Sequence, residues 1–156
     1  MILKDRLRWT KLRQCEGAAM VEFAIGSTVL LLLVLGIIEF GFLWYQKQVI
    51  TNASREGARY GVVYQTVAGS GIRKAPKNFN PTILQVVNNY CNGRIPTGSW
   101  TPSLSGAAST AGDGTDLKGV PLIVTVTCQN KMDLLSGWIP SLANITFTAQ
   151  TAMNCE

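Results

Sequence analysis

The sequence contains no histidine and little charge. Without histidine there is no Ser-His-Asp or Cys-His catalytic group, no histidine-ligated zinc and no imidazole switch near neutral pH. Charged residues make up only 15% of the chain, where about 25% is usual, so apolar sequence is concentrated in one place. Because no nucleophile-base pair or metal-ligand set can be assembled, we expect a protein that is not an enzyme and binds no metal ion or cofactor.

The net charge of +5 is concentrated at the N-terminus. Residues 1–17 carry five basic residues and two acids, so they hold three of the five net positive charges. A basic protein ordinarily suggests a nucleic-acid partner or an anionic surface. Here the charge directly precedes an apolar segment, which makes it a signal of membrane topology, and we expect no nucleic-acid partner.

Residues 18–45 contain no basic residue and only two acids, Glu22 and Glu39. The length matches the roughly 20 residues that a helix needs to cross a bilayer, and the aromatic pair at 44–45 falls where an interfacial belt is expected. A cleaved signal peptide is disfavoured, because its apolar region is about 7 to 15 residues long. With five basic residues before the span and only Lys47 directly after it, the positive-inside rule places the N-terminus in the cytoplasm.

The helical pattern continues beyond the span, from about Ala18 to about Tyr64. Within this continuation the small residues Ala53, Gly57 and Gly61 recur four apart and predict a shallow groove. Another helix could approach closely along such a groove, as at small-xxx-small contacts in membranes. Packing against the protein's own outer domain explains the same pattern, and both interpretations stay open.

A short second helix is expected after residue 80. Asn80 is a good N-cap, Pro81 suits the first helical position, and Asn92-Gly93 closes the helix. Residues 94–119 are rich in Gly, Ser, Thr, Ala and Pro and predict a long surface loop.

Two segments with alternating apolar residues, 120–128 and 144–154, predict an antiparallel hairpin that turns near residue 136. The fold class is α+β, with a long N-terminal helix, a short second helix and a small antiparallel sheet. The buried faces are expected to hold Leu122, Val124, Val126 and Cys128 on one strand and Ile145, Phe147, Ala149 and Met153 on the other. The expected domains are a basic cytoplasmic leader (1–17), a transmembrane helix (18–45), its extracytoplasmic continuation (46–66) and a small extracytoplasmic α+β domain (67–156).

The junction at Gly17 resembles a type IV prepilin. A basic leader is followed by RQCEG-AAMVEF, in which Glu22 and Phe23 resemble the Glu-aromatic pair of the tight-adherence (Flp) branch. The stretches GAAMVEFAI, IIEFG and TNASREGARYGVV, together with the ending TFTAQTAMNCE, resemble the TadE-like family of pilus-assembly pseudopilins. The resemblance is strong over residues 15–63 and weaker over 120–156.

This resemblance implies roles for individual residues. A prepilin peptidase would cut after Gly17 on the cytoplasmic side, and Ala18 would become the new N-terminus. Glu22 would neutralise the N-terminal ammonium of a neighbouring subunit and so set the registry between subunits. Ala18 departs from the Phe that most type IV pilins have at this position, and an uncut membrane anchor is the alternative.

Three cysteines, Cys91, Cys128 and Cys155, fall in the extracytoplasmic part, where one disulfide and one odd cysteine are expected. The predicted hairpin puts Cys128 at its turn end and Cys155 at its open end, on the order of 30 Å apart at about 3.3 Å per residue. These two are therefore the least suitable pair. Cys91 takes one of them, with Cys128 slightly favoured.

The sequence thus predicts a TadE-like pseudopilin in the bacterial inner membrane. Its expected partners are the lipid bilayer, the prepilin peptidase, and other pilins, pseudopilins and pilus assembly proteins. A filament-forming pilin subunit is one alternative. A single-span receptor whose outer domain binds a ligand is another.

Overall fold

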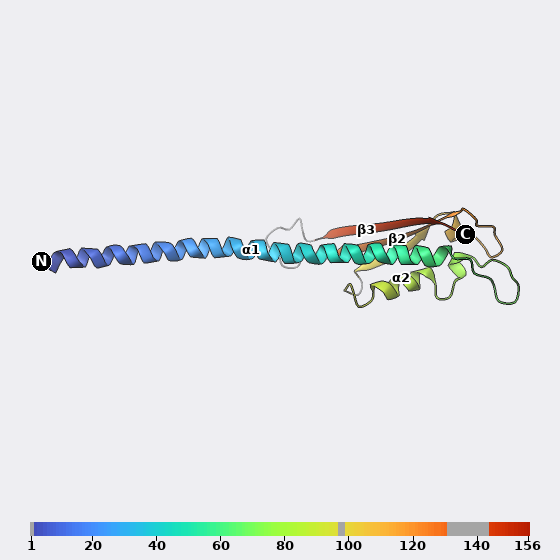
Figure 1. Ribbon diagram of the computed structural model, residues 1–156, viewed down its shortest axis with the longest axis horizontal. Helices are drawn as coiled ribbons and strands as arrows, with labels where there is room; N and C mark the ends of the chain where they lie inside the picture. The colour runs from blue at the N-terminus through green and yellow to red at the C-terminus, as the bar shows by residue number, and fades with distance from the viewer. Residues whose placement is uncertain (1, 97–98, 131–143) are drawn as a thin grey trace. The chain divides into compact units, whose positions relative to one another are not determined.

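The apolar run lies in α1, which spans Ile2–Val62 (Figure 1). The computed structural model describes residues 2–96, 99–130 and 144–156. The expected helix between about Ala18 and Tyr64 is confirmed, and α1 begins earlier because no proline or glycine interrupts residues 2–16.

The chain forms two units, Met1–Phe40 and Gly41–Glu156. In the first unit, large apolar side chains of α1 are exposed, among them Phe23 (75%) and Ile37 (64%). Within the part of the chain that the structure describes, one helix, Gly17–Val62, is long and apolar enough to cross a membrane, and its most apolar stretch of 18 residues has a mean hydropathy of 2.4. Because water penalises so much exposed apolar surface, these features fit a membrane location.

Helix α2 spans Ile83–Cys91 and begins at a different residue from the one expected. The N-cap is Thr82, and Asn80 does not cap the helix. The Thr82 hydroxyl accepts from the Gln85 N–H at 3.2 Å, while the Gln85 side chain accepts from the Thr82 N–H at 2.9 Å. This reciprocal capping box satisfies two backbone donors at once, which a cap at Asn80 cannot do. The expected end is confirmed, with Asn92 as C-cap.

The sheet has three antiparallel strands in the order β1-β2-β3. The two expected strands are confirmed as β2 (Pro121–Asn130) and β3 (Ile145–Asn154), and the predicted turn near residue 136 lies outside the described residues. The prediction of an irregular loop over 94–119 is wrong, because β1 (Trp100–Ser105) and α3 (Ala107–Thr110) form there. The proline in β1 argues against a strand in the sequence, because proline cannot donate a backbone hydrogen bond, although an edge strand tolerates it. A short 3-10 helix, η1, spans Pro76–Asn78.

In the second unit, α1 packs between α2 and the sheet (Figure 1). The expected inward face of β2 is confirmed, since its four apolar residues are fully buried. Each large side chain buried in this way stabilises the fold by about 1.5 to 3 kcal/mol. The residues that form the centre of the core include Ile50, Ile83, Val87, Leu122, Val124 and Val126.

Strand β3 is attached to α1 at both ends and in the middle. The Lys47 ammonium donates to the Thr148 carbonyl at 2.6 Å, and the hydroxyls of Ser54 and Thr151 are 2.8 Å apart. At the end of the chain, the Glu156 N–H donates to the last carbonyl of α1, that of Val62, at 3.4 Å. These polar contacts fix how β3 runs along the helix.

Candidate functional site

The Gly17–Phe23 segment lies on α1 with its side chains exposed. Ala18 and Glu22 are four residues apart and therefore share one face of the helix. Apart from the nearby backbone of its own helix, a Cβ atom at Gly17 would meet nothing within 4 Å. The segment is thus fully accessible within the first unit, as a site for a peptidase or a neighbouring subunit needs to be.

Glu22 is the only charged side chain among residues 17–38. Among the side chains that the structure describes, which begin at Gly17, the one ion pair joins Glu56 and Arg59 and does not include Glu22. The polar neighbours of Glu22 along the helix are internally satisfied: the Ser27 and Thr28 hydroxyls both bond to the Ala24 carbonyl. A shallow, mainly apolar hollow of about 390 Å³ lies on the same stretch of helix, and its lining residues, Val21, Ala24, Ile25, Thr28 and Val29, do not include Glu22.

The small residues Ala53, Gly57 and Gly61 lie in the core of the second unit. A Cβ atom at Gly57 would be 2.5 Å from Val87 of α2, and one at Gly61 would be 2.4 Å from Leu122 of β2. Both distances are shorter than any normal contact between carbon atoms. The groove that the sequence indicates is therefore filled by the protein's own helix α2 and strand β2.

Cys91, Cys128 and Cys155 are free and buried. Burial raises the pKa of the Cys91 thiol to about 11, and a charge on Cys128 adds to this shift. Burial also raises the pKa of Cys128, and that of Cys155, where the nearby Arg73 partly offsets it. The thiols therefore stay protonated near neutral pH, and the folded unit holds no reactive thiolate among them. The predicted disulfide is not formed in this structure.

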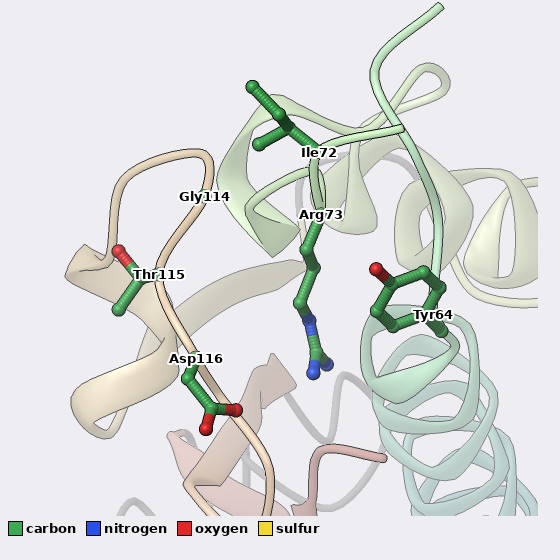
Figure 2. A pocket seen from close by; sticks show the side chains of 6 residues that line it. All are labelled: Tyr64, Ile72, Arg73, Gly114, Thr115 and Asp116. Atoms are coloured by element: carbon green, nitrogen blue, oxygen red, sulfur yellow. The ribbon is translucent and has the colours of Figure 1, made fainter. Parts of the chain in front are cut away.

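A cleft of about 480 Å³ opens near the end of α1 (Figure 2). Figure 2 shows Arg73 extending between Tyr64 and Asp116. Its guanidinium lies 5.2 Å from the centre of the Tyr64 ring and donates to the Glu156 carbonyl. The Gly114 N–H donates to the Arg73 carbonyl at 2.8 Å. The residues that line the cleft are Tyr64, Ile72, Arg73, Gly114, Thr115 and Asp116.

Arg73 has a mainly structural role in this cleft, because its hydrogen bonds join its own loop to the segments that contain Gly114 and Glu156. The sequence does not indicate the cleft, since Arg73 and Asp116 are far apart in the chain. The lining offers one arginine, one aspartate and hydroxyl groups, and no nucleophile next to a base.

These features define a class: a protein with one apolar N-terminal helix and a small α+β unit. The family model described as "TadE-like protein" matches residues 17–59. The match covers Gly17, Glu22 and two of the three small residues of the filled groove, Ala53 and Gly57, and it confirms the resemblance that the sequence motifs carry. The comparisons with curated proteins and with solved structures give no match.

Proposed function

We propose that the protein is a TadE-like pseudopilin, a membrane-anchored subunit without enzymatic activity that takes part in assembling a tight-adherence type pilus. The observation that carries the proposal is the family match over residues 17–59, with Glu22 as the only charged residue among residues 17–38. In this proposal residues 18–45 cross the bacterial inner membrane once. The basic leader lies in the cytoplasm and the α+β unit lies outside.

Glu22 has the properties that a registry residue needs. A carboxylate in hydrocarbon is costly unless it has a partner or reaches water. An ammonium within a few ångströms recovers much of that cost, because the attraction between opposite charges is strong where the dielectric constant is low. Cleavage after Gly17 creates such an ammonium at Ala18, and a neighbouring copy can bring it to Glu22.

The cleavage is tested by mass spectrometry of the N-terminal peptide of the membrane-extracted protein. We expect a chain that begins at Ala18, and Gly17→Leu should leave the chain uncut. The open space around Gly17 means that this substitution does not disturb the helix, so a loss of cleavage reports on recognition by the peptidase. A chain that begins at Met1, in cells that process their major pilin, contradicts the proposal.

The registry role is tested by Glu22→Ala in the full chain. Insertion into the membrane should remain intact, while pilus formation should fall. Ser27→Ala is the matched control, because the Ser27 hydroxyl bonds only within its own helix. Normal piliation of Glu22→Ala would exclude the registry role.

The same experiments separate the two alternatives. A filament-forming pilin subunit is abundant in sheared filaments, whereas an assembly pseudopilin is scarce there. A single-span binding module keeps its N-terminus and is indifferent to Glu22→Ala.

A further inference from the structure

Cys91 and Cys128 occupy neighbouring positions in the core of the second unit. Cys91 ends α2 and Cys128 lies on the inward face of β2, and neither has any exposed surface. The two sulfur atoms are not bonded in the structure. A charge on Cys128 acts on Cys91, so the thiols lie within electrostatic range of each other.

Helix α2 and strand β2 both run along α1, and their residues reach the same positions of α1 at matching intervals. The residues that face the same glycine of α1 are Ile83 and Leu122 at Gly61, and Val87 and Val124 at Gly57. Four residues along a helix and two along a strand both advance the chain by about 6 Å. Four residues after Val87 along α2 is Cys91, and two residues after Val124 along β2 is Val126, so Cys91 lies at the level of Val126. The next inward-facing residue of β2 after Val126 is Cys128.

Strand β1 positions Cys128 from the other side. Trp100 pairs with Cys128 across the two strands. The indole N–H of Trp100 donates to the Asn88 side chain of α2 at 3.0 Å. Asn88 lies one helical turn before Cys91, so the helix and the strand are joined close to both cysteines.

Cys155 lies at the other end of the sheet. It exchanges backbone hydrogen bonds with Gly119 and Val120, at 2.9 and 3.0 Å. Val120 is eight residues from Cys128 along an extended segment, which corresponds to roughly 26 Å. This separation is far beyond the roughly 7 Å between Cα atoms that a disulfide tolerates. Cys155 is therefore the odd cysteine.

We propose that Cys91 and Cys128 form a disulfide when the chain folds in an oxidising compartment. The inference rests on the proposed function, which places the second unit outside the cytoplasm. The two thiols lose two protons and two electrons as the sulfur–sulfur bond forms. A protein disulfide of the dithiol oxidoreductase class accepts the electrons and becomes a dithiol.

The bond forms before the core closes. The attacking species in disulfide exchange is the thiolate, and burial suppresses it in the folded unit. The bridge closes a loop that contains β1, α3 and most of β2. Oxidation therefore ties α2 to the sheet on the face where α1 packs.

The pairing is tested by oxidative refolding of the full chain. Cys15, in the leader, is the fourth cysteine of the chain. The Cys15→Ser variant, which leaves only the thiols of Cys91, Cys128 and Cys155, is unfolded with reductant and refolded in detergent with oxidised glutathione. The remaining thiols are then alkylated under denaturing conditions and the peptides are mapped without reduction. We expect the Cys91 and Cys128 peptides to be joined and Cys155 to be alkylated. A bridge to Cys155, or three alkylated thiols, overturns the pairing.

The location is tested by mapping the protein extracted from cells with the alkylating agent present. The Cys91–Cys128 bridge in this sample supports both the pairing and the extracytoplasmic location. Three free thiols in the cell sample, together with the bridge after refolding, contradict the location and leave the pairing intact. Cys155→Ser is the control, because it should keep the bridge in both samples.

Discussion

Gly57 of α1 and Val87 of α2 are in direct contact, with no room for a methyl group between them: a Cβ atom on Gly57 would lie 2.5 Å from Val87 Cγ2. At this point α1 presents only backbone to α2, so the two helices approach more closely than larger side chains permit. Gly61 repeats the arrangement one turn later, against both α2 and β2. The lack of side chains at these two positions thus allows α1 to lie close to α2 and β2 in the core of the unit.

Gly57→Ala and Gly61→Ala should each lower the free energy of unfolding. The extra methyl group collides with buried side chains, and overpacking of this kind costs about 1 to 3 kcal/mol. The gain in helix propensity, up to about 1 kcal/mol, offsets part of this cost. The measurement is thermal or denaturant unfolding of the full chain in detergent. Gly112→Ala is the control, because a Cβ atom there meets nothing within 4 Å, and its stability should match that of the parent protein.

Thr82→Ala should destabilise the second unit through the loss of the capping box. The substitution removes the hydroxyl that accepts from the Gln85 N–H, while the backbone N–H of residue 82 can still donate to the Gln85 side chain. Removal of an N-cap side chain typically costs about 1 kcal/mol. Asn80→Ala is the informative comparison, since the local sequence pattern favours Asn80 as the cap while the structure does not use it. A larger loss of stability for Asn80→Ala than for Thr82→Ala, measured by denaturant unfolding, contradicts the observed cap.

Ser54 and Thr151 should couple energetically. Their hydroxyls are 2.8 Å apart and Ser54 is fully buried, so Ser54→Ala should cost about 1 kcal/mol. In a double-mutant cycle with Thr151→Val, we expect a coupling energy of about 0.5 to 1 kcal/mol. Additive effects of the two substitutions would show that the contact contributes nothing to the attachment of β3.

The stability of the reduced protein should fall between about pH 9 and pH 11 because of Cys91. Burial raises the pKa of this thiol from 9.0 to about 11, so the folded state holds its proton over a range in which the unfolded state has lost it. The contribution is fully present below pH 9 and is lost as the pH rises toward 11; the total is about 2 to 3 kcal/mol. Cys91→Ala should flatten this part of the curve, measured by unfolding with reductant present. An unchanged slope in Cys91→Ala would assign the decline to other groups.

Elements with a strong local pattern could be predicted from the sequence. The apolar run specified α1, and the alternation from Leu122 to Cys128 specified the buried face of β2. The cap at Thr82 was missed because Asn80 and Pro81 carry an equally good local signal, and the side chain of Gln85 decides between them. Strand β1 was missed because its pairing with β2 is a long-range contact and Pro102 interrupts its pattern.

The candidate sites also differ in how far the sequence predicts them. The motif around Gly17 and Glu22 is local in sequence and could be recognised directly. The occupants of the groove at Gly57 and Gly61 could not be identified, because small residues allow a close approach without specifying what approaches. The cleft at Arg73 is lined by segments that are distant in the chain, so no local sequence pattern predicts it.

The bond between Lys47 and Thr148 has a consequence for how copies of the protein can associate. Strand β3 is last in the order of the described sheet, and its ten residues contain no charge and no proline. Such an edge invites a strand from another molecule. The Lys47 ammonium donates a hydrogen bond to the Thr148 carbonyl of β3. A strand that pairs with β3 there must displace the ammonium or bury its charge. The lysine thus works against pairing of β3 with a strand of another molecule.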